Sequence, residues 1–203
     1  MKLSDLVEQG FAAFIFDCDG TLVDSIPAHL KAMQAAFSRH DLLLPATWFF
    51  QNHSIPLDTL LEKFEADGLG HIADPDLILA DHKKFFMDNV DLVEEIPVVT
   101  TVVREWSGRV PIGVASNGHR ANVEASLRAL SLWSFFDVVV TREDVQHGKP
   151  HPDLYLEAAR RLNVAPEQCL VFEDSDTGIQ GATAAGAAVV DVRQFHTPAW
   201  SHK

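Results

Sequence analysis

The chain has 203 residues, a length that suits one large domain or two small ones. Hydrophobic residues make up 47% of the sequence, which is enough for a core, and 29 acidic residues stand against 16 basic ones. The net charge of −13 argues against nucleic acid or an anionic membrane surface as a partner, because both require a positive protein face.

The start of the chain and its cysteines indicate the cellular setting. The first residues lack the apolar run of a signal peptide, and no apolar run is long enough to span a bilayer. Cys18 and Cys169 lie in apolar runs, where cysteine usually acts as a small buried hydrophobe. We therefore expect a reduced, cytoplasmic protein with free thiols, and a disulfide between neighbouring strands is the alternative.

Short apolar runs alternate with helical patterns in two parts of the chain. These runs lie at residues 11–16, 110–115, 138–140, 169–172 and 187–190. Continuous apolar runs of this length are typical of strands that are buried on both faces. The apolar spacings in 123–130 and 154–162 predict helices between them. Alternating strands and helices predict an α/β fold with a doubly wound parallel sheet.

Residues 25–96 have a different pattern, in which helical spacings dominate. We expect a helical cap domain here, inserted into a core formed by residues 1–24 and 97–203. Its hinges are predicted near 23–27 and 94–98. An insert that follows the carboxyl end of a strand is well placed to act as a lid over a site.

Asp17 and Asp19 directly follow the first apolar run and precede Gly20. Side chains alternate along a strand, so the two carboxylates share a face as long as the chain stays extended. Two close carboxylates repel each other unless one is protonated or a cation lies between them. The pair therefore suits Mg²⁺, or an Asp nucleophile beside an Asp acid/base. The plain alternative is a strand that ends in an Asp-Gly turn.

Polar residues also follow the later apolar runs. They are Ser116, Asn117, Thr141, Lys149, Glu173 and Asp174. Ligands of open α/β sheets bind at the carboxyl ends of the strands, so we expect these side chains to gather at one edge. Taken singly, each of these groups also has an ordinary structural explanation as a helix cap or a surface loop.

The ordered set of motifs resembles the haloacid dehalogenase-like superfamily of phosphotransferases. The motifs are residues 17–25, 114–118, 148–153 and 172–180. The resemblance spans the whole chain and is closest to the branch with a helical cap, which includes β-phosphoglucomutase. The carboxyl-terminal half is most similar to fructose-1-phosphate and 6-phosphogluconate phosphatases. A Rossmann-like core with an inserted helical cap is the fold that this resemblance implies.

The resemblance also implies roles for the motif residues. Asp17 would be the nucleophile that forms an aspartyl-phosphate, and Asp19 would be the general acid and then the base. Mg²⁺ would be bound by Asp17, by the backbone carbonyl of Asp19, by Asp174 and by the nearby Glu173. The phosphate-binding and charge-stabilising groups that complete the implied site are Ser116, Asn117 and Lys149.

Substrate specificity is expected from the cap. His29 falls where mutase-like members carry a cap histidine, although a partly exposed helical histidine without a role is the alternative. Asn52 and His53 precede an amphipathic helix and are candidates for a specificity loop. The same stretch also suits an ordinary helix start, with Ser54 or Asp58 as the N-cap, and this interpretation is slightly favoured.

The predicted function is Mg²⁺-dependent hydrolysis of a small sugar or polyol phosphate by a monomeric enzyme. β-Phosphoglucomutase-type activity is the alternative, but its relatives grip a second phosphate with a cap Arg. No Arg occurs between Arg39 and Arg104, which favours hydrolysis. Dehalogenation is disfavoured, because those relatives lack the second Asp. A non-catalytic phosphate-binding protein is disfavoured because binding alone would not need Asp19.

Overall fold

The computed structural model of the protein describes residues 3–53 and 55–198. The chain divides into two compact units. Of the described residues, the first unit contains 3–24 and Glu94–Pro198, and the second lies within Ser25–Val93. Each unit has its own cluster of buried hydrophobic side chains.

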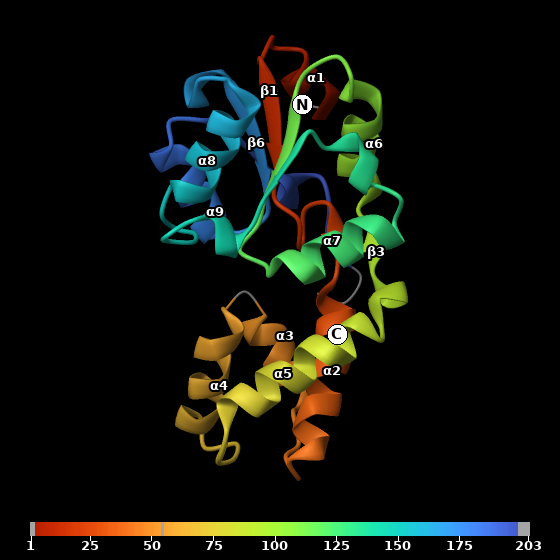
Figure 1. The fold of residues 1–203 in the computed structure, drawn as a ribbon, viewed down its shortest axis with the longest axis vertical. Helices are drawn as coiled ribbons and strands as arrows, with labels where there is room; N and C mark the ends of the chain where they lie inside the picture. The colour runs from red at the N-terminus through yellow and green to blue at the C-terminus, as the bar shows by residue number, and fades with distance from the viewer. Residues whose placement is uncertain (1–2, 54, 199–203) are drawn as a thin grey trace. The chain divides into compact units, whose positions relative to one another are not determined.

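The first unit is built on a five-stranded sheet with the order β5-β4-β1-β6-β7 (Figure 1). Its strands are β1 (Ala13–Phe16), β4 (Ile112–Ala115), β5 (Val138–Val140), β6 (Cys169–Glu173) and β7 (Ala188–Asp191). All neighbouring pairs are parallel, and each strand falls on an apolar run of the sequence. The predicted α/β class with a doubly wound parallel sheet is therefore confirmed.

Helices cover both faces of this sheet (Figure 1). They are α1 (Leu3–Val7), α6 (Pro97–Trp106), α7 (Arg120–Ala129), α8 (Asp153–Leu162) and α9 (Asp176–Ala184). Ile15 of β1 is buried in a cluster with Leu154 of α8 and Ala182 of α9. Phe14, which points to the opposite face, packs against Trp106 of α6 with ring centroids 5.2 Å apart. The two faces thus bury alternate side chains of the central strand.

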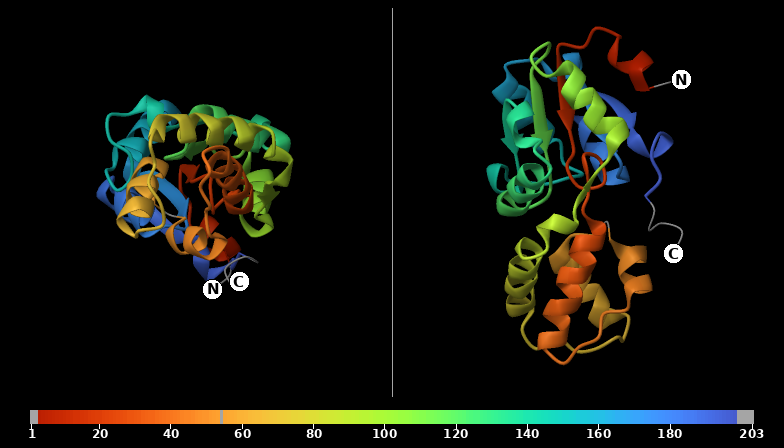
Figure 2. Two further views of the ribbon diagram at one scale, coloured as in Figure 1. Left: turned by 90° about the horizontal axis from the view of Figure 1, so that it is seen from below. Right: turned by 90° about the vertical axis from the view of Figure 1, so that its right-hand side faces the viewer.

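The second unit is helical, as the apolar spacings predict (Figure 2). Its helices are α2 (Ile26–Arg39), α3 (Ala46–Asn52), α4 (Leu57–Ala66) and α5 (Pro75–Met87). Phe37 of α2 meets Phe64 of α4 edge to face, with ring centroids 4.9 Å apart. Asp58 lies in the first turn of α4 and Pro56 is the N-cap residue, so an N-cap at Asp58 is wrong. Ser54 lies outside the described residues.

Two short strands that the sequence pattern does not predict lie where the chain passes between the units. They are β2 (Val23–Asp24) and β3 (Glu94–Glu95), which pair antiparallel. The amide of Ile96 also donates to the carbonyl of Leu22 over 3.0 Å. The two connections between the units are therefore hydrogen-bonded to each other.

Both cysteines are buried free thiols, as expected. Cys169 is paired in register with Ala13 at the start of β1, whereas Cys18 follows the end of that strand. The two side chains thus lie at opposite ends of one strand pair. Within the described part of the chain, no helix combines the length and apolar character needed to cross a membrane.

Candidate active site

The end of β1 places Asp17 and then reverses the chain. The amide of Asp17 donates to the carbonyl of Phe172, which extends the pairing of β1 with β6 by one residue. The chain then turns back, and the amides of Leu22 and Val23 both donate to the carbonyl of Cys18. Gly20 has a φ of +89° in this turn, a conformation that glycine adopts without steric cost. A Cβ at Gly20 would also collide with the carboxylate of Asp174.

Asp174 follows β6 and is tied to the turn after β1. The hydroxyl of Thr21 donates to Oδ1 of Asp174 over 2.8 Å. Sequence reasoning included Thr21 in a motif but gave it no role. Its partner lies 153 positions along the chain, so a single sequence gives no direct signal for the contact.

Lys149 reaches the carboxylates from the segment between β5 and α8. Its ammonium donates to Oδ1 of Asp17 and, over 2.5 Å, to Oε1 of Glu173. The Lys149 side chain is only 3% exposed, so water hardly screens these ion pairs. Burial favours neutral Lys149, but the negative charges of Asp17 and Glu173 outweigh it and raise the pKa of Lys149 well above its usual range. Lys149 is therefore a permanent cation between two carboxylates.

Glu173 is fully buried and has several hydrogen-bond donors around it. Its Oε1 accepts from Lys149 and from the hydroxyl of Tyr155, while Oε2 accepts from the amide and hydroxyl of Ser175. Burial opposes ionisation, but the charge of Lys149 and these hydrogen bonds lower the pKa of Glu173. Glu173 thus stays ionised and holds Lys149. Sequence reasoning assigned Glu173 to the metal and did not identify Tyr155.

Three carboxylates form a cluster suited to a divalent cation. Oxygen atoms of Asp17, Glu173 and Asp174 lie within 4.8 Å of one another. Burial, together with the negative charge of Glu173, raises the pKa of Asp174 to about 7. Burial likewise raises the pKa of Asp17, even though Lys149 opposes the shift. A bound cation would offset this repulsion, and carboxylate oxygens are the ligands that Mg²⁺ prefers.

Ser116 and Asn117 follow β4 and adjoin the same edge. The side chain of Asn117 accepts from the backbone amide of Lys149 over 2.9 Å, which joins the loop after β4 to the lysine segment. Gly118 lies in the same loop, where a Cβ would be 3.1 Å from Oγ of Ser116 and 3.2 Å from Oδ2 of Asp19. The structure therefore brings the Asp19 carboxylate and the Ser116 hydroxyl close to the same point beside Gly118.

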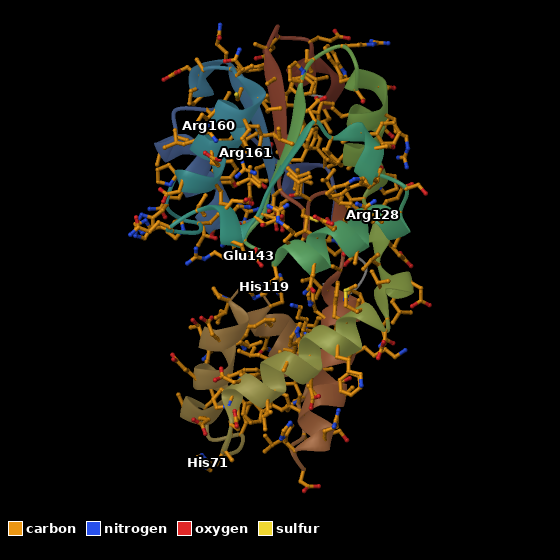
Figure 3. The ribbon with its side chains drawn as sticks, viewed as in Figure 1. His71, His119, Arg128, Glu143, Arg160 and Arg161 are labelled. Atoms are coloured by element: carbon orange, nitrogen blue, oxygen red, sulfur yellow. The ribbon has the colours of Figure 1, made fainter. Side chains whose placement is uncertain are left out.

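A hydrogen bond between two side chains joins loops at this edge. His119, at the start of α7, lies 3.0 Å from a carboxylate oxygen of Glu143, which follows β5 (Figure 3). The core residues of the expected constellation, from Asp17 to Asp174, all gather at the carboxyl edge of the sheet.

The cap candidates belong to the second unit. His29 lies in the first turn of α2, and its Nδ1 is 3.1 Å from Nε2 of buried His82 on α5. The His29 ring also stacks on Phe86, with centroids 4.3 Å apart. Asn52 ends α3 and donates to the carbonyl of Trp48. His53 follows it, with Nδ1 2.7 Å from the carbonyl of Phe50. Their expected part in specificity stays a prediction.

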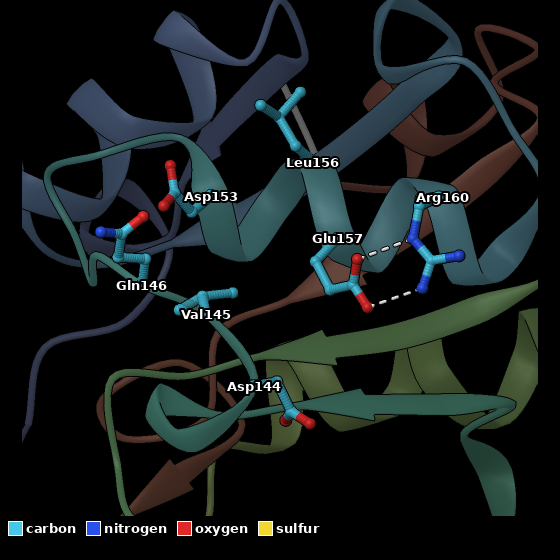
Figure 4. Close-up of a pocket in the computed structure, with 7 residues that line it drawn as sticks. All are labelled: Asp144, Val145, Gln146, Asp153, Leu156, Glu157 and Arg160. Atoms are coloured by element: carbon cyan, nitrogen blue, oxygen red, sulfur yellow. Dashed lines mark hydrogen bonds and ion pairs between the residues drawn. The ribbon is translucent and has the colours of Figure 1, made fainter.

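A separate surface pocket of about 300 Å³ lies beside α8 (Figure 4). It is lined by Asp144, Val145, Gln146, Asp153, Leu156, Glu157 and Arg160. Glu157 and Arg160 pair with each other on its wall. None of the expected site residues lines this pocket, so its chemistry is separate from that of the carboxylate cluster.

Comparisons with known proteins identify the family. The family model described as haloacid dehalogenase-like hydrolase matches residues 11–186. Fructose-1-phosphate phosphatase YqaB of Escherichia coli (strain K12) is 37% identical over 188 residues, which cover 90% of this chain and 97% of that protein. Hexitol phosphatase A of the same organism is 30% identical over 184 residues, which cover 88% of this chain and 82% of that protein.

The chain belongs to the haloacid dehalogenase-like hydrolase family, as its motifs indicated. Within that family it is a phosphoric monoester hydrolase. The fold agrees with the crystal structure of CbbY from Rhodobacter sphaeroides in complex with phosphate, with a TM-score of 0.78 and 24% identity. That match covers 88% of this chain and 84% of the CbbY chain.

Proposed function

We propose that the protein hydrolyses a small sugar or polyol phosphate, with Mg²⁺ as cofactor and an aspartyl-phosphate at Asp17 as intermediate. The observation that carries this proposal is the pairing of buried Asp17 with the Lys149 ammonium inside a cluster of carboxylates. The substrate class is supported by relatives named for fructose 1-phosphate and hexitol phosphates.

Each residue has a defined part in the proposed reaction. A carboxylate oxygen of Asp17 attacks phosphorus, and Asp19 protonates the oxygen of the departing alcohol. Asp19 then takes a proton from the water that hydrolyses the aspartyl-phosphate. Lys149 offsets negative charge on the phosphoryl oxygens, while Ser116 and the backbone of Asn117 bind them.

Asp17 and Asp174 would hold the Mg²⁺ ion, with the backbone carbonyl of Asp19. The ion would supply positive charge between the carboxylates and the phosphate. Glu173 is adjacent to this set, but its oxygens already receive donors from Lys149, Tyr155 and Ser175. We therefore favour an indirect contribution of Glu173 to the metal site.

The test is phosphate release from fructose 1-phosphate, 6-phosphogluconate, hexitol phosphates and β-glucose 1-phosphate, each with Mg²⁺ and with chelator. Metal-dependent release that disappears in Asp17→Asn supports the proposal. Unchanged turnover in a folded Asp17→Asn variant contradicts the assignment of Asp17 as the nucleophile. Conversion of β-glucose 1-phosphate to glucose 6-phosphate with added bisphosphate, without net release, moves the assignment to a mutase.

A further inference from the structure

Tyr155 is the single tyrosine of the chain, and its hydroxyl adjoins the carboxylate cluster. It lies in the first turn of α8 with 1% of its surface exposed. The hydroxyl donates to Oε1 of Glu173 over 2.9 Å, and the Nζ atom of Lys149 lies 5.3 Å from the ring centroid. Tyr155 therefore contacts both Glu173 and Lys149, without being one of the reacting groups.

Oε1 of Glu173 is shared between Tyr155 and Lys149. The Lys149 ammonium is in turn shared between Glu173 and Asp17. The hydrogen bond from the Tyr155 hydroxyl offsets part of the negative charge on the Glu173 carboxylate, and this charge is what attracts Lys149. If the Tyr155 hydroxyl is lost, Glu173 attracts Lys149 more strongly, and the ion pair between Lys149 and Asp17 weakens.

Helix α9 leaves room for this arrangement. A Cβ at Gly178 would collide with the Glu173 carboxylate, and one at Gly181 would lie 3.3 Å from Cε2 of Tyr155. Both helical positions that face the pair thus carry the smallest residue. The contact is made between a residue of α8 and one of β6, and Gly178 of α9 leaves the space that the carboxylate occupies.

We propose that Tyr155 is a positioning residue of the active site, whose hydroxyl sets how Lys149 is shared between Glu173 and Asp17. This inference rests on the proposed phosphatase function. The competing explanation is that Tyr155 only fills the core, where it packs in the cluster beneath α8. Tyr155→Phe separates the two, because it keeps the ring and removes the hydroxyl.

Steady-state kinetics with p-nitrophenyl phosphate and with the best sugar phosphate provides the test. We expect Tyr155→Phe to lower kcat about tenfold, the size expected when a hydrogen bond to a charged group is lost, with KM and the Mg²⁺ requirement unchanged. Thr100→Val is the matched control, because it also removes a buried hydroxyl, one that has no partner within the described part of the chain. The control should keep wild-type kcat.

The single tyrosine also allows a readout that does not depend on turnover. Protein labelled with ¹³C at tyrosine Cζ gives one signal, and we expect it to shift when Mg²⁺ and inorganic phosphate are added to the wild type. Unchanged kcat in Tyr155→Phe, or a Cζ signal that ignores ligand binding, would overturn the role of Tyr155. A wild type without metal-dependent turnover of any ester would overturn the proposed function and this inference with it.

Discussion

At the scale of single residues, Asp19 allows the sharpest test of the proposed chemistry. A general acid matters most when the departing oxygen is strongly basic, as in a sugar alkoxide. We expect Asp19→Asn to slow transfer of the phosphoryl group from a sugar phosphate to Asp17 by about 10²–10⁴-fold, and transfer from p-nitrophenyl phosphate much less, since nitrophenolate leaves without a proton. Single-turnover kinetics on the two esters measures this first step apart from hydrolysis of the aspartyl-phosphate, in which Asp19 acts as base for both. Equal losses in the first step would contradict the acid role.

Gly178 is the second residue whose replacement has a definite consequence. Alanine usually stabilises a helix relative to glycine, but here its Cβ would strike the Glu173 carboxylate. We expect Gly178→Ala to cost about 1–3 kcal/mol of unfolding free energy, the range typical of overpacking, and to lower kcat as Glu173 moves. Urea unfolding measures the first effect. Gln180→Ala, at an exposed position of the same helix, is the control and should lose no stability.

At the scale of elements, the sequence predicted the sheet well and the connections poorly. All five strands lie on apolar runs, which buried parallel strands require. The strands β2 and β3 have two residues each and contain Asp24, Glu94 and Glu95, so they show neither an apolar run nor an alternation. The two strands are separated in the sequence by the whole helical insert, so a local sequence pattern cannot predict that they pair.

Helix α8 carries an ion-pair network whose strength depends on pH. Hydrogen bonds from Arg160, which has the larger effect, and from Arg161 lower the pKa of Glu157 from its usual 4.5 to about 2. A lowered carboxyl pKa stabilises the fold above pH 4.5, and this stabilisation is lost as the pH falls from 4.5 towards 2. Arg161 also pairs with Asp144, so the network links α8 to the segment that follows β5.

Glu157→Gln should therefore lower stability at pH 7 by no more than about 1 kcal/mol, since these side chains are partly exposed. The difference from wild type should shrink as the pH approaches 3. Urea unfolding at pH 7, 5 and 3.5 measures it. The exposed Glu105→Gln on α6 is the control, and an equal, pH-independent loss in both variants would contradict the network.

At the scale of the whole molecule, the sequence predicted which residues gather but not how they are connected. The motif residues meet because the carboxyl ends of parallel strands share one edge. The bonds from Thr21 to Asp174 and from Tyr155 to Glu173 join different elements through side chains. Whether these hydrogen bonds form depends on side-chain packing and rotamers. In the sequence, Tyr155 resembles any buried aromatic residue of an amphipathic helix. The sequence pattern therefore identifies the residues proposed to bind metal and phosphate better than the residues that hydrogen-bond to them.

The molecule as a whole carries a charge of −13, and three carboxylates are clustered in its candidate site, where a phosphate substrate would bring further negative charge. Mg²⁺ should therefore raise the melting temperature of the protein, because an ion that binds the folded state stabilises it. Asp174→Asn should have a higher melting temperature than the wild type without metal, since Asn removes the repulsion from Glu173 and still accepts from Thr21.

The same variant should respond much less to Mg²⁺, so the order of the two melting curves should reverse or converge as the ion is added. Differential scanning calorimetry with chelator and with millimolar Mg²⁺ gives both comparisons. Ca²⁺ serves as a control for simple charge neutralisation. If Asp174→Asn loses stability without metal and keeps the full Mg²⁺ response, then Asp174 is a structural residue and the cation binds elsewhere. If the variant melts higher than the wild type without metal and lower with Mg²⁺, then the fold sacrifices stability to keep a charged carboxylate at position 174, beside the proposed site of reaction.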